Sequence, residues 1–180
     1  KSEEHEINYR QFNKKLELLN QILSLISDIN QASDEKEVKD CIPALLQHTG
    51  EYTDADRVYI FELMSEKQDY YSNTFEWCRE GIVPQIDNLI RISADSMPVW
   101  HEKFLRGETI IIHDLEKICE TMPSEYDILK VQDIHSLLVL PLFANTQLSG
   151  FIGLDNPELV NPGVSISLLS NVGGHLASTL

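Results

Sequence analysis

The sequence lacks the short motifs that mark the common catalytic and nucleotide-binding sites. It contains no Gly-x-x-x-x-Gly-Lys, no Gly-x-Gly-x-x-Gly and no Gly-x-Ser-x-Gly segment, so the best signals for a phosphate-binding loop, a dinucleotide-binding fold and an esterase nucleophile are missing. His101-Glu102 begins like a zinc-protease helix, but Leu105 occupies the position of the second histidine. The sequence therefore predicts no catalytic centre within this chain.

Cysteine is scarce, and the histidines are dispersed. The three cysteines, Cys41, Cys78 and Cys119, form no Cys-x-x-Cys pair, which is typical of a reducing compartment, so we expect a cytoplasmic location. None of the six histidines lies three or four residues from another histidine or from a cysteine. We therefore expect no metal site, although ligands from distant segments could still assemble one.

Basic residues are few. The chain has 14 Lys and Arg against 29 Asp and Glu, a formal net charge of -15, which repels phosphate backbones and anionic lipid head groups. Neither nucleic acid nor a membrane is an expected partner, and no apolar run approaches the ~20 residues that span a bilayer. The 180 residues, 42% of them hydrophobic, fit one globular domain with flanking elements. Because the chain ends inside a helical pattern, we expect it to be part of a longer protein.

An amphipathic helix is predicted from residue 16 to residue 29. Its apolar stripe is wide enough to contact two surfaces. Part of the stripe steps by four and three residues, as in a coiled-coil seam. We call these residues the seam: Phe12, Leu16, Leu19, Leu23 and Ile26. The helix could lie on its own domain or pair with a second copy through the seam. We assign residues 1–31 as a signalling and dimerisation helix and 32–180 as the globular domain.

The remaining pattern predicts helix, mixed sheet, helix. A second helix is capped by Asp34, with Glu37 answering, and ends near Gly50, and Pro43 should kink or break it. A last helix starts at Asn161-Pro162. Short helices are expected over 97–106 and 124–132. Strands are expected over 57–63, 70–78, 89–92, 109–112, 135–143 and 148–155. This order predicts an α+β fold with an antiparallel sheet and the terminal helices on one face.

Several segments resemble GAF domains. SLLVLPL (136–142) and LSGFIGLDN (148–156) resemble the closing hairpin of that family, and LLSNVGGHLA (168–177) resembles the helix that follows. ADRVYIFE (55–62) resembles the first strand. WCREGIVPQI (77–86) resembles a variant of bacterial signalling proteins, often found beside diguanylate cyclase (GGDEF), EAL or histidine kinase modules.

The resemblance implies a GAF-like, PAS-related antiparallel sheet of about six strands, with the terminal helices on one face and a pocket on the other. It implies a non-catalytic sensory domain that binds a small molecule and signals through its terminal helices, as a homodimer, to an attached output domain in cyclic-di-GMP or two-component signalling. No cofactor is predicted. The Asn-Lys-x-Phe-Asp-Glu signature of cyclic-nucleotide-binding members is missing, which argues against that ligand.

The resemblance places the pocket between the sheet and residues 90–132. The candidate ligand-binding residues are Trp77, Met97, Trp100, Phe104, Asp114, Leu129 and Ser136. Three other interpretations stay open. The aromatic candidates could be plain core in a pure dimerisation module with a filled pocket. Cys78 or Cys119 could carry a thioether-linked bilin, although neither precedes a histidine. The chain could also be an enzyme of the free methionine sulfoxide reductase type, which needs reactive cysteines.

Overall fold

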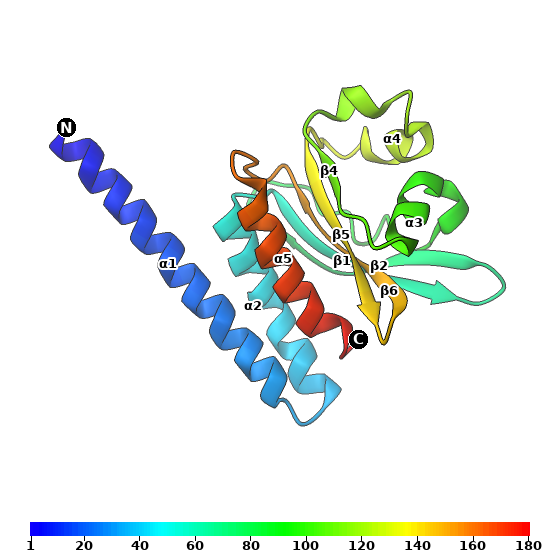
Figure 1. The fold of residues 1–180 in the computed structure, drawn as a ribbon, viewed down its shortest axis with the longest axis horizontal. Coiled ribbons are helices and arrows are strands. Elements are labelled where there is room, and N and C mark those ends of the chain that lie inside the picture. The colour runs from blue at the N-terminus through cyan, green and yellow to red at the C-terminus, as the bar shows by residue number, and fades with distance from the viewer.

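Six antiparallel strands form one sheet, and helices cover both of its faces (Figure 1). The computed structural model describes residues 1–180. The strands are β1 (Arg57–Ser65), β2 (Asp69–Cys78), β3 (Ile92–Ser93), β4 (Ile110–Ile112), β5 (Leu137–Ala144) and β6 (Gln147–Asp155), in the order β3-β2-β1-β6-β5-β4. The helices are α1 (Ser2–Gln31), α2 (Glu35–Thr53), α3 (Pro98–Leu105), α4 (Pro123–Leu129) and α5 (Pro162–Ala177), with 3₁₀ turns η1 (Ala94–Ser96) and η2 (Leu115–Ile118). The predicted α+β architecture is confirmed.

Helix α1 is much longer than its predicted core of residues 16–29. Its C-terminal half packs on the domain through Leu18, Ile22, Ile26 and Ile29, which are buried. Figure 1 shows its N-terminal half extending away from the rest of the molecule. Every residue from 1 to 14 is exposed, so this half has no partner within the chain. No helix of the structure combines the length and the apolar composition that crossing a bilayer requires.

Helix α2 begins as predicted but continues further. The Asp34 side chain accepts a hydrogen bond from the Glu37 amide at 2.9 Å, whereas Glu37 accepts from the amide of Ser33. The predicted break at Pro43 and the end near Gly50 are wrong, because the helix runs unbroken to Thr53. Pro43 is exposed, so water can bind the carbonyl group that it leaves unpaired. Buried packing of neighbouring α2 side chains offsets the lost hydrogen bond.

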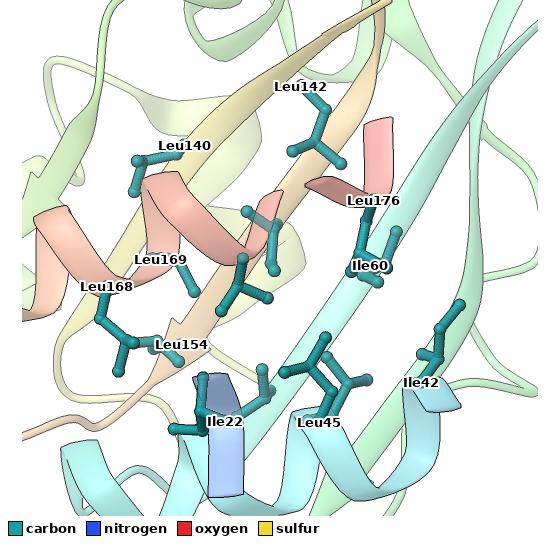
Figure 2. Packing of buried hydrophobic residues seen from close by; sticks show 14 of the residues in the cluster. Ile22, Ile42, Leu45, Ile60, Leu140, Leu142, Leu154, Leu168, Leu169 and Leu176 are labelled. Atoms are coloured by element: carbon teal, nitrogen blue, oxygen red, sulfur yellow. The ribbon is translucent and has the colours of Figure 1, made fainter. Parts of the chain in front are cut away.

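The helix-side core lies between the sheet and helices α1, α2 and α5. Alternate side chains of the central strands point into it, including Ile60 of β1 and Leu154 of β6, and meet Leu45 of α2 and Leu169 of α5 (Figure 2). All four are less than 2% exposed. Burying each such side chain contributes ~1.5 to 3 kcal/mol. The terminal helices therefore share one face of the sheet, as expected.

The opposite face carries an aromatic core under α3, α4 and the segments that join them. Phe151 stacks on Phe61 with ring centroids 4.6 Å apart and on Phe104 at 5.0 Å. A β-bulge in β2 pairs Ile60 with Phe75 but Phe61 with Asn73, which leaves Thr74 as the extra residue. Because a one-residue slip exchanges the two faces of a strand, the bulge sets which β2 side chains point to each core.

Two smaller predictions need correction. The strand expected at 89–92 is only Ile92–Ser93, and the helix expected from Ser124 begins at Pro123 after Met122 and ends at Leu129. The two adjacent glycines of α5, Gly173 and Gly174, differ in their surroundings. A Cβ on Gly173 would lie 2.6 Å from Cδ2 of Leu142, but Gly174 faces open space, so only the first glycine is needed for packing.

Replacing Gly50 with alanine should destabilise the fold, whereas the same change at Gly174 should stabilise it. An added Cβ at Gly50 would lie 2.1 Å from Cζ3 of Trp77, while nothing lies within 4 Å of one at Gly174. Displacing a packed ring costs ~1 to 3 kcal/mol, and alanine gains up to about 1 kcal/mol over glycine within a helix. Urea unfolding of Gly50→Ala and Gly174→Ala measures both, and equal effects would contradict the assigned contact.

Candidate functional site

A small cavity lies between the sheet and the segments that cover its aromatic face. Its volume is about 40 Å³, and since one water needs ~10 to 15 Å³ it has room for only a few. The aromatic part of the wall is Tyr59, Phe61, Trp100 and Phe151, and the polar part is Asn73, Glu76, Gln85, Gln132 and Asp155. The cavity thus has an aromatic wall and a polar end, at the predicted place in the fold.

Three of the seven predicted ligand-binding residues line this cavity: Met97, Trp100 and Leu129. Phe104 is fully buried next to them and packs against Trp100 and Phe151, but it is not part of the wall. A binding role for these residues stays a prediction.

The other three predicted residues lie elsewhere. Trp77 points to the helix-side core and covers Gly50, because it alternates with the cavity residue Glu76 along β2. Asp114 is exposed and caps η2 by accepting the Glu116 amide. Ser136 interacts with Asn156 only through its backbone: its amide donates to the Asn156 side chain, and its carbonyl accepts from the Asn156 amide. The structure does not bring these three side chains to the cavity.

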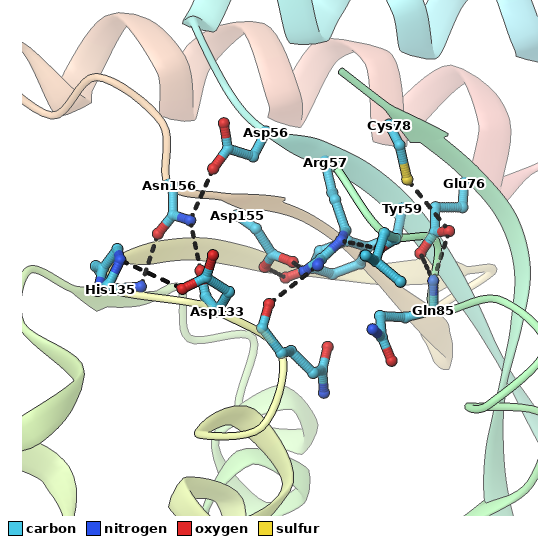
Figure 3. A network of polar contacts seen from close by, with 12 residues as sticks. Asp56, Arg57, Tyr59, Glu76, Cys78, Gln85, Asp133, His135, Asp155 and Asn156 are labelled. Atoms are coloured by element: carbon cyan, nitrogen blue, oxygen red, sulfur yellow. Dashed lines mark hydrogen bonds and ion pairs between the residues drawn. The ribbon is translucent and has the colours of Figure 1, made fainter. Parts of the chain in front are cut away.

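A buried ion pair forms the polar end of the cavity (Figure 3). Nη1 of Arg57 donates to Oδ2 of Asp155 at 3.0 Å, and the hydroxyl of Tyr59 donates to Oδ1 at 2.9 Å. The other guanidinium nitrogens donate to the carbonyl oxygens of Gln132 and Val83. Arg57 and Asp155 are only 3% and 1% exposed. Their full set of partners is what makes burial of both charges tolerable.

Glu76 holds the segment that closes the cavity between β2 and β3. Its carboxylate accepts hydrogen bonds from the backbone amides of Gln85 and Ile86 at 3.0 and 3.3 Å, and from the thiol of Cys78 at 3.4 Å. Burial, together with the nearby Glu76 charge, raises the pKa of Cys78 to about 12. Cys78 is therefore a protonated thiol at neutral pH and a poor nucleophile.

Glu125 joins α4 to α3. Its Oε1 accepts from the amides of Val99 and Trp100 at 2.7 and 3.2 Å, and so caps the first turn of α3, where Met97 provides no side-chain cap. The residue is 1% exposed. Its Oε2 and the indole Nε1 of Trp100 are buried without a hydrogen-bond partner. Both residues line a second cavity of about 20 Å³.

Sequence reasoning missed the charged residues of the site. Arg57 and Asp155 stand at the ends of otherwise apolar strands, and that position was an available signal. Glu76 is one residue from the predicted Trp77, but only the bulge in β2 decides which of the two faces the cavity. Glu125 carries no signal in the sequence because it acts on another helix. No group of three or more His, Cys, Asp or Glu side chains comes together to hold a metal.

The stability of the fold should depend on the ionisation of Asp155. Burial raises the pKa of this carboxyl from 3.8 to about 6, against the opposing effect of hydrogen bonds from Arg57 and Tyr59. The folded protein therefore binds the proton more tightly than the unfolded chain. The resulting stabilisation is complete below pH ~4 and is lost as the pH rises through 6, and it amounts to about 3 kcal/mol at most.

Asp155→Asn removes this titration. The free energy of unfolding of the wild type, minus that of the variant, should be larger at pH 4.5 than at pH 7.5. Urea unfolding at the two pH values measures the difference. Asp87→Asn, which removes the same charge from an exposed position, is the control and should show no such change. A gap that widens as the pH rises would mean that Arg57 outweighs burial.

Both the sequence and the fold of this chain are similar to those of known proteins. A family model of the GAF domain matches residues 37–177. The methanogenesis regulatory histidine kinase FilI of Methanothrix harundinacea is 34% identical over 118 residues, which cover 62% of this chain and 13% of the kinase. The chain thus spans only a small part of the length of this relative.

Solved structures show the same fold. The phycocyanobilin-bound GAF domain from a cyanobacterial phytochrome is 16% identical with a TM-score of 0.71, over 89% of this chain and 91% of that one. The GAF domain from an Acinetobacter phosphoenolpyruvate-protein phosphotransferase is 14% identical with a TM-score of 0.65, over 89% and 90%. Because the family model matches well over half of the residues, this chain belongs to the GAF domain family.

Proposed function

We propose that this chain is the sensory domain of a larger signalling protein. In this proposal, a small molecule in the cavity changes the arrangement of α1 and α5, which pass the change to an output domain. The observation that carries the proposal is that β1 and β6 each contribute side chains to the cavity on one face of the sheet and to the helix-side core on the other. Tyr59 and Phe151 of these strands line the cavity, whereas Ile60 and Ile152 pack under the helices. A ligand that shifts either strand must therefore also move the side chains that pack against the helices on the opposite face.

The exposed part of the seam supports a homodimer. Phe12, Leu16 and Leu23 are 66%, 47% and 55% exposed, whereas Leu19 is half-buried and Ile26 is buried against its own domain. A helix end without tertiary packing is marginal in water. A second copy of α1 would cover the three exposed side chains and stabilise the projecting half of the helix.

A groove beside the seam extends this surface. It has a volume of about 610 Å³ and lies between α1 and α5, with Leu23 on one wall and Val164 on the other. The imidazole Nδ1 of His175 and the Asn30 side chain are 2.9 Å apart across these two helices. A dimer interface at this groove would involve both α1 and α5. A change in the arrangement of these helices could then reach a domain attached at either end of the chain.

For the output domain we propose a histidine kinase and thus a two-component route. The support is the curated relative, which is a histidine kinase by name. A GGDEF diguanylate cyclase is the second candidate, and it rests only on the sequence resemblance of residues 77–86. In either case the catalytic activity belongs to another part of the full-length protein.

Two alternatives, a thioether-linked bilin and a reductase, find little support in the site. A linear tetrapyrrole is far larger than a cavity of about 40 Å³, and the pKa of Cys78 is raised to about 12, which disfavours thioether formation. The raised pKa values of Cys78 and Cys41 also argue against a reductase. The small cavity volume favours the pure dimerisation module, whereas the carboxylates of Glu76 and Asp155 in its wall favour a ligand.

The dimer is tested by sedimentation of the chain at micromolar concentrations. The wild type should dimerise, and the double variant Leu16→Asn, Leu23→Asn should raise the dissociation constant at least tenfold, because it removes the apolar contacts of two of the three exposed seam residues. Gln21→Asn with Ser24→Asn, at exposed positions outside the seam, is the matched control. A wild type that stays monomeric at the highest concentration would overturn the dimer proposal.

The ligand is tested by mass. Under native conditions the purified chain should carry a small added mass that denaturation releases. Equal native and denatured masses, after incubation with a cell extract of small molecules, would instead assign the cavity to the core of a dimerisation module.

A further inference from the structure

We propose, building on the sensory role above, that the cavity recognises a small organic ammonium ion and that Glu125 is its anchoring carboxylate. Three observations point to this chemistry: the sign of the charges around the cavity, the unpaired oxygen of Glu125, and the aromatic wall.

The charges around the site favour a cation. The 40 Å³ cavity has Glu76 and Asp155 in its wall, and the adjoining 20 Å³ cavity has Glu125. No Lys, Arg or His side chain lines either cavity. The nearest guanidinium, that of Arg57, is already bound to Asp155 and to two backbone carbonyls. An anionic ligand would therefore face the carboxylates of Glu76 and Glu125, which have no cationic partner in either cavity wall, whereas a cation would neutralise part of their charge.

Of the three carboxylates, only that of Glu125 has an oxygen without a hydrogen-bond partner. Glu76 uses both oxygens on the backbone of residues 85 and 86, and Asp155 uses both on Arg57 and Tyr59. Glu125 uses only Oε1, for the α3 cap, while Oε2 is buried without a partner. A buried polar atom without a partner is unfavourable, and an ammonium group offers three donors. A charge-assisted bond to Oε2 is the strongest that the site can form.

The aromatic wall suits the remainder of such a ligand. Trp100 belongs to both cavities, as do Met97, Ile128 and Leu129, so the two spaces adjoin across the same side chains. The rings of Trp100 and Phe151 lie 6.1 Å apart, nearly perpendicular. Ring faces attract cations and pack against short alkyl chains. The combined volumes limit the ligand to an amine of a few carbon atoms.

One competing explanation is a single structural water. A cavity of about 20 Å³ can hold one, and a water could accept from Nε1 of Trp100 and donate to Oε2 of Glu125. A water requires no charge on Glu125 and does not distinguish amines from alcohols. This difference separates the two explanations.

The experiment is calorimetric titration of the 180-residue chain with n-propylammonium, 1-propanol and propionate, which are similar in size and differ in charge. The wild type should bind propylammonium at least tenfold more tightly than either of the others. Glu125→Gln keeps an oxygen for the α3 cap, so it should fold with an unchanged melting temperature but bind propylammonium at least tenfold more weakly. Glu120→Gln removes the same charge from an exposed position that precedes Glu125 in the chain. It is the matched control and should bind propylammonium like the wild type.

Other outcomes overturn the inference in distinguishable ways. Equal binding of propanol and propylammonium, or unaltered binding by Glu125→Gln, would favour the structural water. Tight binding of propionate alone would reverse the charge argument but leave a sensory role in place. If none of the three binds, the ammonium inference fails. The native mass of the chain then decides whether the ligand-sensing function fails with it.

Discussion

The ion pair between Arg57 and Asp155 joins β1 and β6, the two central strands of the sheet, at the point where these residues are paired in register. All three guanidinium nitrogens of Arg57 donate hydrogen bonds, one to Asp155 and two to the carbonyl oxygens of Gln132 and Val83. One planar side chain thus fixes two strands and the two segments that border the cavity. Removing either partner of such a pair commonly costs about 3 to 5 kcal/mol, because the other charge stays buried. The wall residue Tyr59 depends on it as well, through its bond to Asp155.

The sheet has two cores, and the side-chain period of the strands connects them. Neighbouring residues of one strand point to opposite faces, so β1 contributes Tyr59 to the aromatic core and Ile60 to the helix-side core. Close packing leaves little slack in either. Gly153 allows the Tyr59 ring to lie against β6, since a Cβ there would be 2.4 Å from the ring. A rigid layer between cavity and helices transmits displacement better than a compliant one.

Local patterns predicted most of the fold but only part of the site. The alternating and helical periods located β1, β2, β5, β6, α2 and α5, because each element buries one face. Pro43 misled the prediction, since its solvent-side position was not visible in the sequence. Trp77 and Glu76 are adjacent, and a single bulge decides between them. Glu125 caps a helix 25 residues away, a contact that only tertiary structure creates. The site is assembled from segments far apart in the sequence, beyond the reach of periodicity.

In the proposed signalling role, the projecting half of α1 would act as a lever arm. With a rise of 1.5 Å per residue, the unsupported stretch of residues 1 to 14 is roughly 20 Å long. A tilt of about 5° where the helix leaves the domain would displace its tip by about 2 Å. Sub-ångström adjustments of the strands below the helix could therefore arrive at the N-terminal end as movements comparable to the spacing between helical residues.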